Sequence, residues 1–252
     1  MNKIISKIVV ALMLVLVLVV NVLSIDINTC QKVKNTVEDY SIYCGAFHTY
    51  SDLESGYDIK VEKIISDKLI KSESKVYIFD IDETCLNNYI GEFILKAKGI
   101  NVYNKVWVKR DRLILGLSHP ELVVKEDIKK AINQLIKENK KVYFVTNTEQ
   151  TYSKEVTETI SKLLEIENPK ILFKSINPGR DNSWKYKRFN EIVKIENVNI
   201  EDITFVGDDI KDFPNLNIDN FGIKYFLIPQ KMYGIQEIYR EKYNKYIEKE
   251  VK

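Results

Sequence analysis

Hydrophobic positions along the chain follow two alternating patterns, one typical of helices and one typical of buried strands. Over residues 59–70, apolar residues recur every three or four positions, which predicts an amphipathic helix. Over residues 75–81, β-branched and aromatic residues form a nearly continuous run, which predicts a strand buried on both faces. Runs of the same kind predict further strands at 141–145, 170–173, 203–206 and 224–228. Helical spacing predicts further helices at 126–137, 153–164 and 184–193.

Strands that alternate with helices predict an α/β fold: a doubly wound (Rossmann-like) parallel sheet with helices on both faces. The stretch 85–125 has weaker periodicity, so we expect a small cap or flap inserted there, after the first strand. In doubly wound sheets, ligands bind beyond the carboxyl ends of the strands. The residues at these ends are therefore the first candidates for chemistry, and they are Asp80, Thr146, Lys174 and Asp208.

The first 24 residues have the pattern of a secretory signal peptide. Lys3 and Lys7 precede an uncharged apolar run over residues 8–23, and Ser24 supplies a small residue for cleavage. We expect a secreted or extracytoplasmic protein. The alternative is an uncleaved segment that anchors the chain through residues 8–23, and membrane contact is expected in that case alone. Whether or not the segment is cleaved, we expect residues 25–70 to form an N-terminal helical arm and residues 71–252 to form the main domain.

The charge balance argues against a nucleic-acid partner. The chain has 38 Lys and Arg against 36 Asp and Glu, without a basic run interleaved with aromatics. A hydrophobic content of 45% is enough for one α/β domain with a core of its own. Cys30 and Cys44 are near each other in the sequence after the signal, and a disulfide between them would cross-link the N-terminal arm of an exported protein.

Two aspartates, Asp80 and Asp82, follow the first predicted strand. Because side chains alternate along an extended segment, we expect both to project to the same side. Two close carboxylates repel each other, so one holds a proton or a cation lies between them. One can then act as a nucleophile and the other as an acid or base. The structural alternative is a pair of loop or capping aspartates.

A second acidic cluster follows the fourth predicted strand, with Gly207, Asp208 and Asp209 followed by Asp212. Glycine permits a sharp exit from a strand, and the spacing of Asp208 and Asp212 lets both point at one site. Hard oxygen ligands with open positions suit Mg²⁺. We assign Asp208 to the metal and supporting roles to Asp209 and Asp212. The alternative is a helix N-terminus with acidic residues that its dipole favours.

A candidate phosphate cradle follows the second predicted strand. Thr146 is expected to end the strand, Asn147 comes next, and a helix follows, so that hydroxyl, amide and backbone N–H groups meet at a helix N-terminus. Lys174 and Lys185 come later in the chain, and a lysine beside Asp80 would hold that carboxylate ionised. An ordinary turn threonine and a solvated helix face are the alternatives.

The ordered combination of these motifs resembles the haloacid-dehalogenase (HAD) superfamily, and more narrowly its secreted plant-type class B and bacterial class C acid phosphatases. The motifs that carry the resemblance are Phe79-Asp80-Ile81-Asp82-Glu83-Thr84-Cys85-Leu86-Asn87-Asn88, Tyr143-Phe144-Val145-Thr146-Asn147, residues 183–192 with Lys185 and Arg188-Phe189, the Gly207–Asp212 run, and Gln230-Lys231-Met232-Tyr233-Gly234. The chain departs from the family at Thr148 and Glu149, where members usually carry a basic residue after the Thr/Ser-Asn pair.

The resemblance implies a Mg²⁺-dependent acid phosphatase that hydrolyses small phosphomonoesters through an aspartyl phosphate. Asp80 would be the nucleophile, and Asp82 would protonate the leaving alcohol and then activate water. The Asp80 carboxylate, the Asp82 backbone carbonyl and Asp208 would hold Mg²⁺. Asp212 would orient a metal-bound water or Lys185.

The same resemblance assigns the phosphoryl oxygens to Thr146, Asn147 and Lys185, of which Thr146 and Lys185 count among the catalytic residues with the two aspartates. Asp82 favours an oxygen leaving group, since dehalogenases of the superfamily lack this second aspartate. Family members often form dimers, so a homodimer is a further expectation. Two other functions on this fold stay open: a non-catalytic exported storage or surface-binding protein, and a phosphotransferase.

Overall fold

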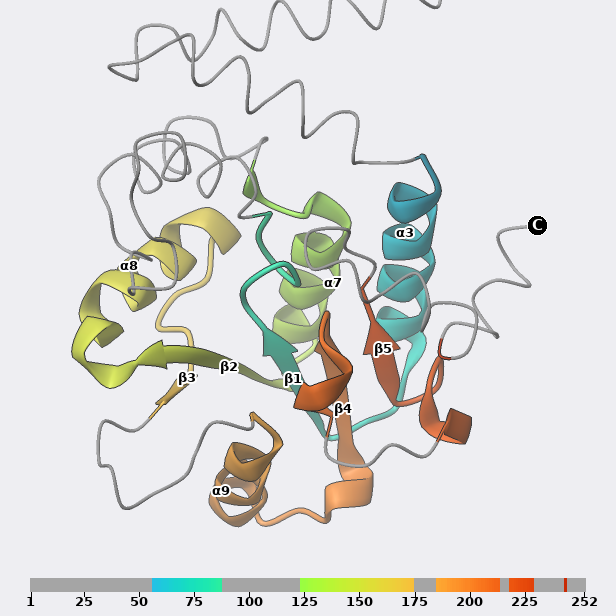
Figure 1. Cartoon of the computed structure of the whole chain (residues 1–252). Helices are drawn as coiled ribbons and strands as arrows, with labels where there is room; N and C mark the ends of the chain where they lie inside the picture. The colour runs from blue at the N-terminus through green and yellow to red at the C-terminus, as the bar shows by residue number, and fades with distance from the viewer. Residues whose placement is uncertain (1–55, 88–122, 175–184, 214–217, 229–242, 244–252) are drawn as a thin grey trace, which may run out of the picture.

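The computed structural model describes residues 56–87, 123–174, 185–213, 218–228 and residue 243 (Figure 1). The predicted signal peptide or anchor, most of the helical arm, the Cys30 and Cys44 pair and most of the predicted cap lie outside these residues. Within the described part of the chain, no helix is long and apolar enough to cross a membrane. The described residues form the sheet and the helices that position the candidate site.

Five parallel strands form one sheet in the order β3-β2-β1-β4-β5. The strands are β1 (Val76–Asp80), β2 (Lys141–Glu149), β3 (Ile171–Lys174), β4 (Ile203–Gly207) and β5 (Tyr225–Leu227). Every residue of β1, β4 and β5 is buried, as the continuous apolar runs predict for strands covered on both faces. The first strand lies at the centre and the later strands extend to either side of it, which confirms the doubly wound parallel sheet.

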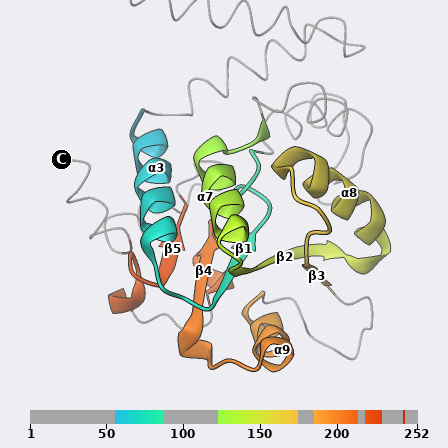
Figure 2. The same cartoon turned by 180° about the vertical axis from the view of Figure 1, so that it is seen from behind.

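Helices cover both faces of this sheet (Figure 1, Figure 2). The helices α3 (Gly56–Lys71), α7 (Glu126–Lys137) and α8 (Ser153–Leu164) pack on one face, and α9 (Tyr186–Glu196) packs on the other. The alternation of side chains along β1 divides the core accordingly, because Tyr77 and Phe79 belong to the three-helix side and Val76 and Ile78 to the α9 side. Four short 3-10 turns complete the described elements: η2 (Gln150–Tyr152), η3 (Ile200–Asp202), η4 (Ile210–Asp212) and η5 (Ile218–Asn220).

The helix α3 belongs to the core of the domain, although it precedes the boundary predicted at residue 70. Its fully buried residues, which share a cluster with β1 and α7, are Val61, Ile65 and Leu69. A buried ion pair between Glu62 and Lys125 also joins α3 to the residue before α7. The end of the predicted arm therefore packs as an integral helix of the α/β domain.

The two described segments that flank the predicted cap are hydrogen-bonded to each other. The backbone N–H of Asn87 donates to the carbonyl of Val123 at 2.6 Å, and that of Lys125 donates to the carbonyl of Cys85 at 3.0 Å. These bonds pair the segment that enters the insertion with the segment that leaves it. Asn87 and Val123, which flank residues 88–122 in the sequence, therefore lie side by side.

One prediction about β2 is wrong. The strand continues past residue 145 to Glu149, where it pairs with Lys174 of β3, and η2 separates it from α8. Thr146 and Asn147 therefore lie within a strand, so the described structure forms no cradle of helix N–H groups at these two residues. The physical reason is that the β-branched residues Thr146 and Thr148 favour extended backbone, and that pairing with β3 resumes at Glu149 after a register shift.

Candidate active site

Asp80 ends β1 with a fully buried carboxylate. Its Oδ1 accepts a hydrogen bond from the backbone N–H of Ile81 at 2.7 Å, and its Oδ2 lies 2.7 Å from Nζ of Lys185. The carboxylate of the predicted nucleophile is thus held by a backbone N–H and by an ammonium at the carboxyl edge of the sheet.

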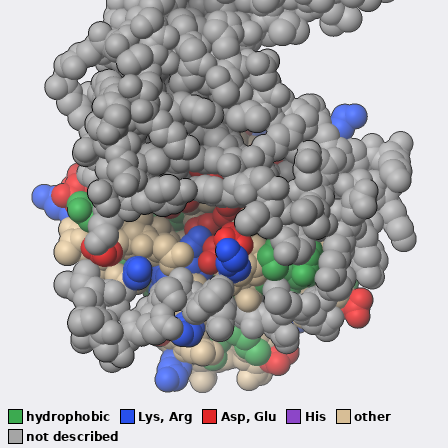
Figure 3. Space-filling model, viewed as in Figure 1, with side chains coloured by type: hydrophobic (Ala, Val, Ile, Leu, Met, Phe, Trp, Pro, Cys, Tyr) green, Lys and Arg blue, Asp and Glu red, His purple; other side chains and the backbone are tan. Residues whose placement is uncertain are grey.

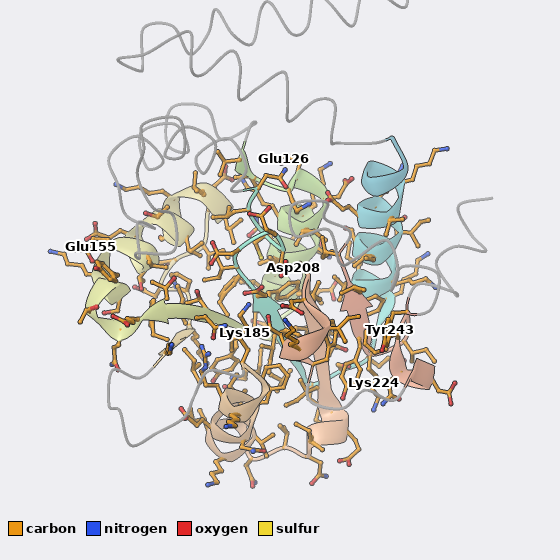
Figure 4. All side chains as sticks on the ribbon, viewed as in Figure 1. Glu126, Glu155, Lys185, Asp208, Lys224 and Tyr243 are labelled. Atoms are coloured by element: carbon orange, nitrogen blue, oxygen red, sulfur yellow. The ribbon has the colours of Figure 1, made fainter. Side chains whose placement is uncertain are left out.

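Lys185 immediately precedes α9 and bridges two carboxylates. Its Nζ lies 2.7 Å from Oδ2 of Asp80 and 2.6 Å from Oδ2 of Asp212. Figure 4 shows Lys185 and Asp208 close together at the carboxyl ends of β1 and β4. Burial by itself lowers the pKa of this ammonium, but the surrounding aspartates outweigh burial and raise its pKa above the ordinary value. Lys185 therefore stays charged at physiological pH.

The exit of β4 requires a glycine. A Cβ on Gly207 would lie 2.8 Å from two ring carbons of Phe205, well inside van der Waals contact. Because Gly207 lacks a Cβ, the backbone can pass directly over the ring as the strand ends. Asp208 is thereby placed at the strand end, where it is 4% exposed and lies beside Asp80.

Asp209 and Asp212 have different roles, although they belong to one acidic run. Oδ1 of Asp209 accepts a hydrogen bond from the backbone N–H of Lys211 at 3.0 Å and so caps the turn η4. Asp212 ends η4 and directs its buried carboxylate at Lys185. The structure therefore brings Asp212 into the site and gives Asp209 the supporting role of a cap.

Three buried carboxylates form a candidate cation site. One oxygen from each of Asp80, Asp208 and Asp212 lies within 4.8 Å of the others. Burial, and next the charge of Asp80, raise the pKa of Asp208 well above its usual range, and burial raises the pKa of Asp212 to about 6. A divalent cation relieves such a concentration of anionic oxygens, and the set fits a hard ion such as Mg²⁺. Acidic and basic side chains gather in the middle of the face seen in Figure 3.

Asp82 lies two residues beyond Asp80, in the turn that follows β1. It is half-buried, and its carboxylate is separate from the cluster of three. The turn is closed by the carbonyl of Ile81, which accepts backbone hydrogen bonds from Cys85 at 3.0 Å and from Leu86 at 3.1 Å. Asp80 and Asp82 therefore occupy different environments, as a nucleophile and an acid or base require.

Thr84 is a site residue to which the sequence analysis gave no role. Its Oγ1 lies 3.5 Å from both Oδ2 of Asp80 and Oδ1 of Asp208, and it is fully buried. The available signal was its place four residues after Asp80 in the first motif. The neighbouring Cys85 donates from Sγ to the backbone carbonyl of Asp80 at 3.1 Å, and burial raises the pKa of its thiol well above the usual value. A buried neutral thiol is a packing residue here.

The end of β2 carries the predicted phosphoryl-binding residues. The Thr146 hydroxyl accepts from the backbone N–H of Thr148 and donates to the Thr148 hydroxyl, both at 3.1 Å. Asn147 is exposed, and its Oδ1 accepts from Nη2 of Arg188 at 2.6 Å. Arg188, which the sequence analysis placed in a motif without a role, is 1% exposed. In the sequence, the position of Arg188 one helical turn after Lys185 could have indicated a role at the site.

Comparisons with known proteins give a family and a fold. The chain matches the HAD superfamily, subfamily IIIB (Acid phosphatase), over residues 17–236. It is similar to the class C acid phosphatase from Bacillus anthracis with tungstate bound, with a TM-score of 0.52, 19% identity, and coverage of 76% of this chain and 85% of that one. A second structure of the class C acid phosphatase from Bacillus anthracis gives a TM-score of 0.52 and 17% identity, with coverage of 79% and 90%. No curated protein sequence matches the chain.

Proposed function

The chain belongs to the HAD superfamily, subfamily IIIB, and is an acid phosphatase; from this premise we propose that it hydrolyses small phosphomonoesters in a Mg²⁺-dependent reaction through a phosphorylated Asp80. The observation that carries the proposal is the contact of 2.7 Å between Asp80 and the Lys185 ammonium, inside a cluster of buried carboxylates. These groups come from β1, β4 and the start of α9, which meet at the carboxyl edge where the fold class places ligands.

In the first proposed step, a carboxylate oxygen of Asp80 attacks the phosphorus in line. A new O–P bond forms as the P–O bond to the alcohol breaks. The Lys185 ammonium holds the Asp80 carboxylate in place before attack and offsets the charge of the phosphoryl group during transfer. Asp82 donates its proton to the departing alkoxide oxygen, so the alcohol leaves neutral.

In the second proposed step, Asp82 returns to its starting state. Its carboxylate removes a proton from water, and the water oxygen attacks the phosphorus of the aspartyl phosphate. The O–P bond to Asp80 breaks, which releases inorganic phosphate and regenerates the Asp80 carboxylate. Acid and base roles alternate on one residue, which suits a half-buried carboxylate outside the charged cluster.

Mg²⁺ would be held by the carboxylates of Asp80 and Asp208 and by the backbone carbonyl of Asp82, with Asp212 beside them. When bound, the ion supplies positive charge to the oxygens of the phosphoryl group. The charge balance supports this assignment. Once all three clustered carboxylates are ionised they contribute −3, and Lys185 with the buried Arg188 contributes +2, so the sum is −1. A divalent ion brings the sum to +1, which suits an anionic substrate.

Catalysis is better supported than a storage or surface-binding role. Lys185 contacts Asp80 and Asp212, and Asp208 lies within 4.8 Å of both carboxylates. A protein that only binds has no need of this costly arrangement. A phosphotransferase would use the same groups with an alcohol in place of water. We further propose that residues 1–24 direct export, on the strength of their charge and hydropathy pattern.

The proposal is tested by hydrolysis of p-nitrophenyl phosphate by the purified protein, with Mg²⁺ and with a chelator, beside Asp80→Asn. We expect metal-dependent turnover in the wild type and a loss of at least about a thousandfold in the variant, as for removal of a catalytic nucleophile. Acid quench of a single turnover with radiolabelled substrate should trap labelled wild-type protein and leave Asp80→Asn unlabelled. Wild-type turnover that Asp80→Asn retains would contradict the assignment of the nucleophile.

A further inference from the structure

Arg188 joins the start of α9 to the ends of β2 and β3. It is 1% exposed, and its guanidinium donates to the backbone carbonyl of Thr146, to the carbonyl of Leu172 at 3.3 Å and to Oδ1 of Asn147 at 2.6 Å. Its own backbone N–H donates to the carbonyl of Lys185 at 3.0 Å. One helical turn thus carries the lysine that contacts the nucleophile and the arginine that contacts the neighbouring strand end.

The guanidinium decides which end of the Asn147 amide is available for other partners. Arginine has donors and no acceptor, so the amide oxygen of Asn147 must face Arg188. The NH₂ end, Nδ2, then points away from the guanidinium. Within the described residues, Nδ2 makes no hydrogen bond. Asn147 therefore presents a pair of N–H donors in a fixed direction.

Asn147 lies on the same face of the sheet as the nucleophile. Asp80 pairs in register with Val145 on β2, and beyond Val145 the register between β2 and β3 shifts. Val145 and the β1 residues Val76 and Ile78, which share the face of Asp80, all belong to the core cluster on the α9 side. Asn147 is exposed, and its Oδ1 accepts from Arg188 of α9, which places its amide on the α9 side as well.

We propose that Arg188 is a positioning residue that acts through Asn147, orienting its amide so that Nδ2 donates to a non-bridging oxygen of the phosphoryl group. This inference rests on the proposed function, since it names the group that receives the donor. It assigns Asn147 as a donor of fixed polarity, and it explains why a buried arginine is placed three residues after Lys185. Arg188 itself stays covered and touches no substrate.

The first test reverses the polarity of position 147. In Asn147→Asp, a carboxylate oxygen still accepts from Arg188, and the donor is replaced by an anionic acceptor. We expect KM for p-nitrophenyl phosphate and Ki for inorganic phosphate to rise about tenfold to a hundredfold, as for a lost hydrogen bond to a charged group. The melting temperature should not fall, because the contact with Arg188 is kept. Unchanged KM and Ki would overturn the proposal.

The second test asks whether Arg188 acts through Asn147. Arg188→Lys keeps the charge but not the planar fork that reaches three acceptors, so we expect KM and Ki to rise at least about fivefold. In the Asn147→Ala background, the same change should alter them by less than about twofold, because the amide it orients is gone. An equal factor in both backgrounds would overturn the proposal. Lys194→Gln, an exposed lysine in the last turn of α9, is the matched control and should leave all values unchanged.

A third measurement separates this inference from the proposed function. Binding of inorganic phosphate to the wild type and to Asn147→Asp, in the presence of Mg²⁺, is followed by titration calorimetry. Weaker binding in Asn147→Asp supports the inference whether or not turnover is detected. Equal binding by two folded proteins overturns it, even when the wild type is an active phosphatase. If Arg188→Lys does not fold, Arg188→Gln is tested in its place, with the same expectation in both backgrounds.

Discussion

The ammonium group of Lys185 lies 2.7 Å from the carboxylate of Asp80, with both side chains almost fully covered by protein. Two charges buried this closely are stable only as a pair, because either one alone would carry an uncompensated desolvation cost. The contact therefore couples the start of α9 to the end of β1. It also gives the nucleophile a permanent positive neighbour.

Removing this ammonium should disable the reaction. In Lys185→Met, the carboxylates of Asp80 and Asp212 lose their shared partner, and the phosphoryl group loses a positive charge during transfer. We expect kcat to fall at least about a hundredfold, in the range seen when one stabilising group is removed from an active site. Steady-state kinetics with p-nitrophenyl phosphate measure the loss. The exposed Lys194→Met on the same helix serves as the control, and similar kinetics for the two variants would contradict the role of Lys185.

The metal-free protein should lose stability as the pH rises from about 4 to about 7. Burial raises the pKa of Asp212 from 3.8 to about 6, so the folded state binds more protons than the unfolded state in this window. Stability then falls as the pH rises through the folded-state pKa, by about 3 kcal/mol at most. Urea unfolding with a chelator at pH 4.5 and pH 7 measures the slope, and Asp212→Asn should flatten it. An identical slope in the wild type and the variant would show that Asp212 is not the group responsible.

Added Mg²⁺ should stabilise the protein more at pH 7 than at pH 4.5. Burial raises the pKa of Asp208 and raises that of Asp212 to about 6, so protons compete with the cation for these carboxylates more strongly at pH 4.5 than at pH 7. The rise in melting temperature with Mg²⁺ at the two pH values measures the difference. Asp208→Asn should reduce the rise at pH 7. A rise that is independent of pH, or that survives in Asp208→Asn, would place the cation elsewhere.

A methyl group at position 207 should displace the end of β4. In Gly207→Ala, the new Cβ would lie 2.8 Å from the ring of Phe205, so either the ring or the backbone that carries Asp208 has to move. We expect a stability loss of about 1–3 kcal/mol, as for overpacking in a core, together with reduced activity. The double variant Gly207→Ala/Phe205→Leu has room for the methyl group and should recover part of the activity. No recovery would mean that the contact with Phe205 is not the cause.

The buried ion pair between α3 and the start of α7 should depend on both partners. In Lys125→Met, the carboxylate of Glu62 is left buried without its ammonium, and we expect a loss of about 3 kcal/mol in the free energy of unfolding. The double variant Lys125→Met/Glu62→Leu removes both charges and should recover much of the lost free energy of unfolding. The exposed pair of Lys130 and Asp127 on α7 is the matched control, and Lys130→Met should cost less than about 1 kcal/mol. Equal losses for the two lysine variants would contradict the buried pairing.

Much of the fold followed from local patterns alone. The predicted helices at 126–137 and 153–164 agree with α7 and α8 at both ends, because apolar positions at helical spacing fill one face of each helix. The strands could be predicted because a strand that is buried on both faces has a nearly continuous run of apolar residues. The rule that ligands bind at the carboxyl ends of parallel strands then placed Asp80 and Asp208 together, and the structure confirms that they are neighbours.

The end of β2 shows where local patterns failed. Thr146 to Glu149 is a polar stretch, so hydrophobicity ends the strand at residue 145. The backbone of these residues nevertheless stays extended, with Glu149 paired to Lys174 across from it. Strand pairing satisfies backbone groups whatever the side chains are, and a partner strand that comes more than twenty residues later cannot be read from the pattern of β2 itself.

By itself, the sequence determined which segments are helices and strands, and which acidic residues lie at strand ends. It could do so because the period of side-chain direction, two residues in a strand and 3.6 in a helix, is a property of a single segment. Only the tertiary structure decided which of several similar residues take part in the site. It directed Asp212 to Lys185 while Asp209 caps η4, and it set Arg188 against Asn147. These roles depend on contacts between side chains far apart in the chain. The packing angle of α9 and the order of the strands determine such contacts, and no single segment encodes either of them.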